Sequence, residues 1–227
     1  MSKLGFDAGD LSRWEEKIFK GRTQYAILPD ASGSRYLQAA STAASSGLYS
    51  KFDYDVVPGL KLSWRWRAKI FPIKARPDKL ADRGQDDFAA RVYAIFPGAS
   101  FFKTDVIEYI WDKELPAGTL ESSPFSSRVK LYVIRSGPAP SDGSMVMEER
   151  DLYEDYLRIF GQPPKRPFGA LAIMSDSDNT GTASAADFAD VLIKQSLGTV
   201  RLVPSPEKVQ GNNFSKDVDR TKGEEGS

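Results

Sequence analysis

The stretch FGALAIMSDSDNTGTASAADFADVLI, residues 168–193, decides how the rest of the chain is interpreted. Its first apolar run, GALAIM, has the length and composition of a buried strand, and its last part, AADFADVLI, predicts a second strand. The residues between them, 175–181, are rich in Asp, Asn, Ser and Gly, the residue types that favour turns. Two strands joined by a polar turn predict a β-hairpin, with a loop longer than the tight two-residue kind.

Two other stretches alternate between apolar and polar residues, as a strand with one buried face does. Residues 60–70, LKLSWRWRAKI, place Leu, Trp, Ala and Ile on one face and Lys, Ser and Arg on the other. Residues 86–96, DDFAARVYAIF, place Phe, Ala and Val on one face, with Asp87, Arg91 and Tyr93 opposite. Both stretches predict strands that carry charged groups on the face away from the core.

The remaining sequence predicts many short strands, frequent turns and one helix. The helix is expected over 151–160, DLYEDYLRIF, where an apolar stripe is followed by Gly161 and two prolines that stop it. We therefore predict an all-β fold, an antiparallel β-sandwich of jelly-roll type with one short helix. Residues 1–195 are expected to form a single domain, and the polar residues 196–227 a disordered C-terminal tail.

Composition excludes several classes of function. The 31 basic and 31 acidic residues balance, which argues against nucleic-acid binding. The sequence has no cysteine and no histidine, so disulfides, Ser-His-Asp and Cys-His catalysis and HExxH zinc sites are excluded. No apolar run reaches the roughly 18–20 residues of a membrane span. No signal peptide is visible, so the protein is cytoplasmic or its leader is missing from this chain, and nothing in the sequence sets an oligomeric state.

The acidic turn is a candidate calcium site. Asp176, Asp178, Thr180, Gly181 and Asp187 occupy positions 1, 3, 5, 6 and 12 of a D-x-D-x-[DN]-G loop. Thr180 replaces a carboxylate or amide, Asp187 replaces the usual Glu, and strands rather than helices flank the loop. The same residues are also accounted for by an ordinary turn whose Asp and Asn side chains bond their own backbone.

A second candidate site is a polar face. If the two alternating strands are neighbours, Arg65, Arg67, Asp87, Arg91 and Tyr93 come together on one surface. Guanidinium and phenol groups suit sugar hydroxyls, carboxylates or phosphates. A solvated face held by cross-strand ion pairs would use the same residues. In either case Arg91 points away from the core, so Arg91→Ala is expected to leave folding intact.

Four large aromatic residues are candidates for stacking on sugar rings, namely Trp64, Trp66, Tyr109 and Trp111. The two tryptophans of the 60–70 strand share their face with leucine and isoleucine, which instead places them in the hydrophobic core. We therefore expect these aromatic residues to be structural.

Several stretches together resemble a known family: SSGLYSKFDYD, LSWRWR, DDFAARVYAIF, EYIW, VIRSG, EERDLYEDYLRIFG and AIMSDSDNTGTASA. They are similar, in order and over roughly residues 10–193, to the bacterial domain-of-unknown-function family DUF3047. The resemblance implies a β-sandwich similar to carbohydrate-binding modules and a periplasmic or extracellular location. It implies no activity and no catalytic residues. By analogy with such sandwiches, Asp190 in the last strand would bind a structural calcium ion together with N-terminal backbone oxygens. No other cofactor is expected.

Three hypotheses for the function follow. The first is a non-catalytic binding module for a glycan or another polyhydroxylated or anionic ligand. The second is a hydrolase or lyase that acts on a polysaccharide without histidine. Adjacent Asp86 and Asp87 point to opposite sides of a strand and cannot face each other as an acid–base pair, which weighs against this hypothesis. The third is an accessory protein of an envelope assembly that docks through its tail.

Overall fold

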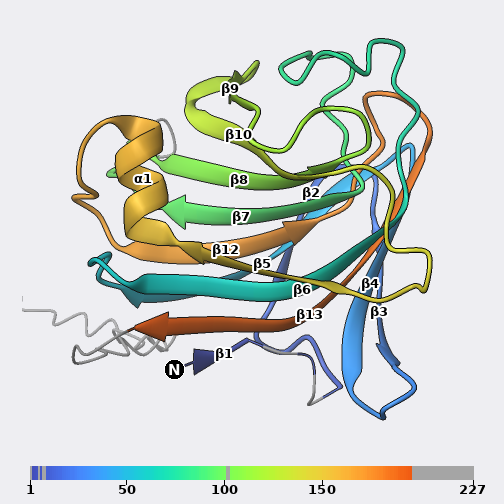
Figure 1. The fold of residues 1–227 in the computed structure, drawn as a ribbon, viewed down its shortest axis with the longest axis horizontal. Helices are drawn as coiled ribbons and strands as arrows, with labels where there is room; N and C mark the ends of the chain where they lie inside the picture. Colours follow the sequence, from blue (N-terminus) through green and yellow to red (C-terminus); the bar gives the residue numbers. More distant parts are fainter. Residues whose placement is uncertain (1, 5, 7–8, 101–102, 196–227) are drawn as a thin grey trace, which may run out of the picture.

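A computed structural model of the protein describes residues 2–4, 6, 9–100 and 103–195. Within these ranges the chain forms two β-sheets and one α-helix (Figure 1). The predicted tail, 196–227, lies outside the described residues. The described part contains no helix that is long and apolar enough to cross a membrane.

The six-stranded sheet is built around β13. Its strands follow the order β11 (Val146–Asp151), β6 (Leu60–Ile70), β13 (Ala183–Gln195), β4 (Arg35–Thr42) and β3 (Gln24–Pro29), and β1 (Ser2–Lys3) pairs with the end of β13. All of its described strand pairs are antiparallel.

The seven-stranded sheet is built around β12 and β7. Its strands follow the order β2 (Glu15–Lys20), β5 (Ser45–Tyr54), β12 (Phe168–Met174), β7 (Ala90–Phe96), β8 (Asp105–Asp112), β10 (Ser126–Ser136) and β9 (Leu120–Ser123). The β8–β10 pair is parallel, whereas the other pairs in this sheet are antiparallel. The antiparallel sandwich that the sequence predicts is therefore confirmed, with this pair as an exception.

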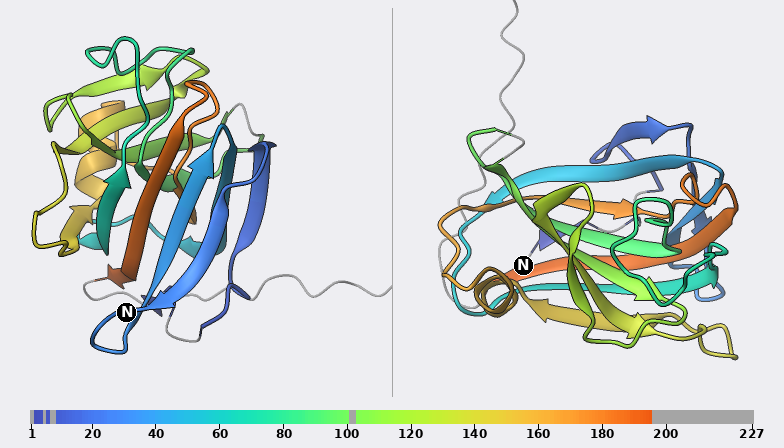
Figure 2. Two further views of the ribbon diagram at one scale, coloured as in Figure 1. Left: turned by 90° about the vertical axis from the view of Figure 1, so that its right-hand side faces the viewer. Right: turned by 90° about the horizontal axis from the view of Figure 1, so that it is seen from above.

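The two strands of residues 168–193 do not pair with each other. β12 lies between β5 and β7, whereas β13 lies between β6 and β4 in the other sheet. The left view of Figure 2 shows β13, in orange-red, between β4 and β6. The predicted hairpin is therefore wrong, because the polar turn crosses from one sheet to the other. Since β4 to β7 also alternate between the sheets, the topology is of jelly-roll type.

The main core lies between the sheets and is rich in aromatic rings. Trp64 and Trp66 on β6 face Tyr109 and Trp111 on β8, with ring centroids 5.5 Å apart for Trp64–Tyr109 and 5.6 Å for Trp66–Trp111. All four side chains are buried, which confirms that they are structural. These pairs join the six-stranded sheet to the seven-stranded one, because β6 and β8 belong to different sheets.

The helix α1 (Leu152–Phe160) packs at the left end of the sandwich in Figure 1. The Asp151 side chain accepts hydrogen bonds from two N–H groups of the first turn, and Gly161 ends the helix at φ 72°. Tyr156 stacks edge-on against Phe96 of β7, with ring centroids 4.9 Å apart. The helix that the sequence predicts is thus confirmed, with Asp151 as its N-cap.

A second, smaller hydrophobic cluster lies on the outer face of the seven-stranded sheet. The loop at 71–89 supplies Leu80 and Phe88, which pack over side chains of β8 and β10. This loop covers one part of the outer face and leaves the part next to it open. The members of this cluster are Leu80, Phe88, Ile110, Leu115, Leu131 and Val133.

Candidate functional site

A cavity of about 440 Å³ opens on the outer face of the seven-stranded sheet, and we call it the sheet pocket. β12, β7 and β8 form its floor. Arg91 of β7 is paired in register with Met174 of β12, and Tyr93 of β7 with Glu108 of β8. The pocket is lined by Phe19, Ser45, Asp86, Arg91, Tyr93, Glu108, Phe125, Met174, Asp176, Asp178 and Asn179.

Arg91 is the centre of the floor. Its Nη1 donates to Glu108 Oε1 at 2.8 Å, and its Nε lies 2.9 Å from Asp176 Oδ1. Its Nη2 donates to the backbone carbonyl of Asp86 and lies 3.7 Å from that residue's Oδ1. The guanidinium also lies over the Phe88 ring, 4.5 Å from the centroid. One buried cation thus faces carboxylates from three separate segments of the chain.

Burial shifts the pKa values of the carboxyl groups around Arg91. It raises the pKa of Glu108 to about 7, and it raises the pKa values of Asp86 and Asp176, although Arg91 opposes each shift. Burial disfavours the charged form of Arg91 as well. Asp176 and Glu108 outweigh that effect and hold the pKa of Arg91 well above its usual value. The guanidinium of Arg91 therefore stays charged, whereas the carboxyl groups around it bind protons more tightly than exposed carboxyl groups do.

Tyr93 extends the floor toward β12. Its hydroxyl accepts a hydrogen bond from Arg91 Nη1 at 3.3 Å and donates to Met174 Sδ at 3.4 Å. Burial raises the pKa of Tyr93 well above its usual value, so the phenol remains neutral. Its hydroxyl is therefore a hydrogen-bonding group that does not change its charge near neutral pH.

Two exposed phenylalanines stand at the edge of the sheet pocket. Phe19 lies where β2 loses its register with β5, between Ile18 and Lys20, and is 64% exposed. Phe125 lies in the turn between β9 and β10 and is 57% exposed. A break in register re-aims a side chain, and exposed aromatic rings beside a polar cavity are typical of binding sites.

Asp87 is not part of the lining and holds the acidic turn. Its Oδ1 accepts hydrogen bonds from the backbone and side-chain nitrogens of Asn179, and its Oδ2 accepts one from the N–H of Thr180. Asp86 and Asp87 thus have different partners, as expected of adjacent extended residues. Asp87, Asp176 and Asp178 each place a carboxylate oxygen within 4.8 Å of the others. Among the described residues these are the acidic groups that could share a metal ion.

Several of these oxygens already have partners. The Asp87 oxygens are bonded to the turn, and Asp176 Oδ1 accepts the Phe88 N–H and faces Arg91. Calcium takes about six to eight oxygen ligands, so it would need further oxygens besides the unengaged ones of these three carboxylates. Calcium in the turn therefore stays a prediction, which removal of the metal would test.

The other predicted metal ligands lie elsewhere, on β13. Asp187 is fully buried and bonded to Arg67, with Lys69 Nζ 3.7 Å away, and its place in a calcium loop stays a prediction. Asp190 adopts φ 49° at a register break of β13 and binds Arg65 Nε at 2.5 Å. Each of these carboxylates is paired with an arginine of β6.

The predicted polar face is divided between the two sheets. Arg65 and Arg67 lie on β6, in the six-stranded sheet, whereas Arg91 and Tyr93 lie on β7, in the seven-stranded sheet. The condition that these strands are neighbours is therefore not met. The structure brings Arg91 and Tyr93 into the sheet pocket, places Asp87 beneath the adjoining turn, and leaves Arg65 and Arg67 among ion pairs on the other sheet.

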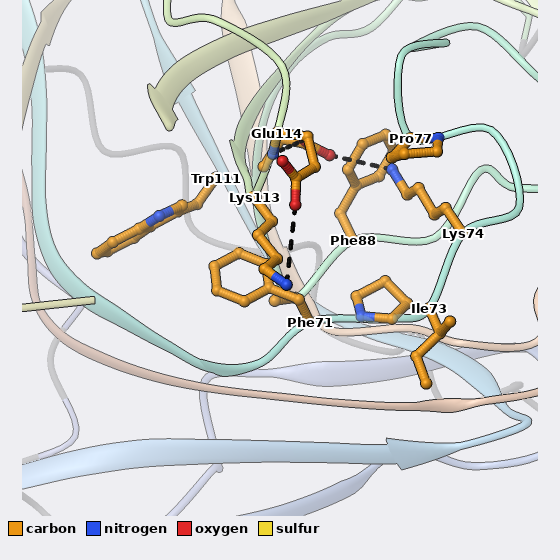
Figure 3. A pocket seen from close by; sticks show the side chains of 11 residues that line it. Phe71, Ile73, Lys74, Pro77, Phe88, Trp111, Lys113 and Glu114 are labelled. Carbon is orange, nitrogen blue, oxygen red and sulfur yellow. Dashed lines mark hydrogen bonds and ion pairs between the residues drawn. The ribbon is translucent and has the colours of Figure 1, made fainter. Parts of the chain in front are cut away.

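Figure 3 shows a second, smaller cavity of about 180 Å³ beside the loop at 71–89, which we call the loop pocket. The buried Lys74 donates to Asp112 at 3.1 Å, and its Nζ lies 3.6 Å from the centre of the Phe88 ring. Asp112 also accepts the N–H groups of Glu114 and Leu115. Both oxygens of Asp112 are therefore engaged, whereas Asp86 Oδ1 in the larger sheet pocket has no hydrogen-bond partner among the described residues.

The sequence matches the model of one protein family over most of its length. The model of DUF3047, described as a protein of unknown function, matches residues 12–192. The chain belongs to this family. No curated protein matches the DUF3047 chain in sequence.

Solved structures similar to this DUF3047 protein include carbohydrate-binding modules of the β-sandwich superfamily, with TM-score 0.45 and 11% identity, covering 84% of this chain and 60% of that one. The enzymatically active domain of bacteriophage CBA120 tailspike protein 4 has TM-score 0.44 and 10% identity, with coverage of 85% and 21%. A carbohydrate-binding module specific for non-crystalline cellulose, CBM28, has TM-score 0.40 and 10% identity, with coverage of 85% and 93%. This chain thus spans less than two thirds of the first two chains.

Sequence reasoning did not find Glu108, Phe19 or Phe125 as members of a site. Glu108 carries a recognisable pattern, because it is a lone acidic residue within the apolar strand VIEYIW and alternates with core residues. Phe19 and Phe125 carry none, since their exposure depends on a register break and on a turn between two strands.

Proposed function

We propose that this DUF3047 protein is a non-catalytic module that binds a glycan in the sheet pocket. The observation that carries this proposal is one cavity with hydrogen-bonding groups on its floor and two exposed phenylalanine rings, Phe19 and Phe125, beside it. A saccharide presents hydroxyl groups to polar side chains and C–H faces to aromatic rings, so it matches both parts of the cavity.

The floor is organised before any ligand arrives. Arg91, Glu108 and Asp176 hold one another through ion pairs, and Tyr93 is fixed between Arg91 and Met174. A site whose side chains are already ordered loses less conformational entropy when it binds. Asp178 and Asn179 are the more accessible polar residues of the lining, and their side-chain oxygens offer acceptors to sugar hydroxyls.

Screening on a glycan array, followed by calorimetry with the best ligand, tests this function. We expect Phe19→Ala and Phe125→Ala each to weaken binding by about 3- to 10-fold, the value of one aromatic contact. Met147→Ala is the matched control, because Met147 is similarly exposed but lies on β11 in the other sheet. A protein that binds no glycan, or one whose affinity the two phenylalanine variants leave unchanged, would contradict the proposal.

A second candidate is a hydrolase or lyase that acts on a polysaccharide, and Glu108 favours it. This carboxyl group has its pKa raised to about 7 by burial and shares the Arg91 guanidinium with Asp176. A general acid works best with a pKa near the working pH. Both groups are nearly inaccessible, however, at 2% exposure each, which is why binding is our first proposal.

Incubation of each bound glycan with the protein separates the two functions. New reducing ends or unsaturated products that disappear in Glu108→Gln, while binding persists, would establish catalysis. Absence of product from every glycan that binds would support the non-catalytic module.

We also propose that the protein works outside the cytoplasm, where bacterial envelope glycans are found. This location is the one that the family resemblance implies. Fractionation of cells that express the full-length gene tests it, and recovery of all the protein in the cytoplasmic fraction would contradict it.

A further inference from the structure

The lining of the sheet pocket contains more acidic than basic side chains. Asp86, Glu108, Asp176 and Asp178 line it, and Arg91 is the cation on its floor. Two lysines lie nearby but outside the lining, and each has a partner of its own. Lys20 at the rim donates to the backbone carbonyl of Asp178, and Lys74 lies against Phe88 and is paired with Asp112. If all of these side chains were ionised, the lining would carry four negative charges and one positive charge.

One oxygen of this group has no hydrogen-bond partner. Asp86 is 8% exposed, and its buried Oδ1 makes no hydrogen bond within the described residues. The nearest cation given by the structure is Arg91 Nη2, at 3.7 Å, beyond hydrogen-bonding distance. Buried polar atoms are nearly always satisfied, so an orphaned acceptor in the wall of a cavity indicates a missing donor.

The pocket can relieve its excess charge in two ways. Its carboxyl groups can hold protons, which agrees with the raised pKa values of Asp86, Glu108 and Asp176 that burial causes. Alternatively, a ligand can bring a positive charge and take the place of those protons. A ligand that brings a further negative charge would meet like charges in a poorly solvated site.

We propose that the sheet pocket selects saccharides that carry free ammonium groups, that is, glycans with unacetylated amino sugars, over neutral saccharides and uronic acids. This inference rests on the proposed function of the same pocket. An ammonium group has three donors and no acceptor, so it suits a lining that consists largely of acceptors. The anionic ligand that the sequence alone allowed is disfavoured at this site.

An ammonium group suits the pocket better than a divalent metal ion does. Arg91 already occupies the position between Glu108 and Asp176, and it would repel a doubly charged ion. Both oxygens of Asp87 are bonded to the turn. Hydrogen bonds from an ammonium group need only a few acceptors, whereas calcium needs about six to eight oxygen ligands.

Four oligosaccharides of one length with the same β-1,4 backbone test the proposal by calorimetry. Their units are glucosamine, N-acetylglucosamine, glucose and glucuronic acid, so they differ mainly in charge. We expect the glucosamine oligomer to bind at least about tenfold more tightly than the N-acetylglucosamine and glucose oligomers, and the glucuronic acid oligomer to bind most weakly. Raising the salt concentration from about 0.05 to about 0.5 M should weaken the glucosamine complex alone.

Asp178→Asn is the informative variant, because Asp178 lines the pocket but is only partly buried, so folding is preserved. It should reduce affinity for the glucosamine oligomer about tenfold, and its effect on affinity for the glucose oligomer should be several-fold smaller. Asp190→Asn is the matched control. Asp190 is paired with Arg65 on the other sheet, and asparagine tolerates its positive φ. It should change neither affinity.

Three results would overturn the inference. They are equal binding of the glucosamine and N-acetylglucosamine oligomers, no binding of the glucosamine oligomer, and a calcium ion that raises Tm and displaces that oligomer. If the neutral oligomers or other array glycans still bind in a way that depends on Phe19 and Phe125, the proposed glycan-binding function stands and only the preference for ammonium groups fails.

Discussion

Arg91 neutralises carboxylates that come from three places in the chain: Asp86 before β7, Glu108 on β8 and Asp176 after β12. Its alternation with core residues correctly placed it on the face opposite the core. That face is not open to solvent at this point, and 3% of Arg91 is exposed. The sequence-based expectation that Arg91→Ala leaves folding intact is therefore replaced by the opposite one.

We expect Arg91→Ala to lower the free energy of unfolding by about 3–5 kcal/mol, because it leaves buried carboxyl groups without their cation. Arg65→Ala is the comparison, since the Arg65–Asp190 pair is more than a third exposed, and it should cost less than about 1 kcal/mol. Urea denaturation of both variants at neutral pH measures these values. Equal, small losses would mean that solvent reaches the Arg91 cluster.

The raised pKa of Glu108 predicts that the stability of the protein depends on pH. Its pKa is raised to about 7 in the folded protein from 4.5, so the folded state binds its proton more tightly than the unfolded state. Its contribution to stability is therefore complete below about pH 4.5 and is lost as the pH rises through about 7.

Glu108→Gln removes this titration. Relative to the variant, the wild type should lose stability as the pH rises from 5 to 8, by up to about 1.4 kcal/mol per pH unit. Denaturation curves at several pH values give the difference. A constant difference between the two proteins would show that the folded and unfolded proteins have the same pKa at this position.

At the scale of elements, the turn at 175–181 is held by a residue that is distant in sequence. Asp87 accepts the N–H groups of Asn179 and Thr180 and so fixes the crossing between the sheets. The composition of the turn predicted a polar loop and even its candidate acids. The composition could not show that Asp87 binds this turn. The two are more than ninety residues apart in sequence, and such a contact leaves no local pattern.

Asp87→Ala should therefore destabilise the protein by about 3 kcal/mol, through loss of hydrogen bonds to a buried charged group. Asp151→Ala removes a cap of the short helix and should cost about 1 kcal/mol. Thermal unfolding of both variants compares the two elements. A smaller effect for Asp87 than for Asp151 would contradict the structural role assigned to Asp87.

Metal removal tests the same turn. We expect excess chelator to leave Tm unchanged, because the oxygens of Asp87 and Asp176 already have partners. A calcium ion present at about a hundredfold its Kd would instead add about 2.7 kcal/mol to the stability of the folded protein. If chelator lowers Tm and Asp178→Ala abolishes the effect, calcium binds the turn. If the effect survives that substitution, calcium binds at Asp190.

At the scale of the whole molecule, local patterns predicted most strands but not their neighbours. The alternation in 60–70 and in 86–96 matches β6 and β7 and separates their buried and outer faces, except at Ile70, which is 50% exposed, and at Phe88 before β7, which packs in the outer cluster. Which sheet a strand joins depends on pairing with residues far along the chain. For that reason the sequence could not show that Arg65 and Arg91 lie in different sheets, or that residues 168–193 do not form a hairpin.

The central positions of β12 and β13 have a consequence for synthesis on the ribosome. Without β12 the seven-stranded sheet is divided between β5 and β7, and without β13 the six-stranded sheet is divided between β6 and β4. The nascent chain therefore leaves the facing edges of β5 and β7 unpaired until β12 has left the exit tunnel, and those of β6 and β4 unpaired until about residue 195 has done so. Such edges invite pairing with other chains. Ribosome-bound chains stopped at residue 165 should be protease-sensitive and depend on chaperones, whereas chains released after completion should become resistant in one late step.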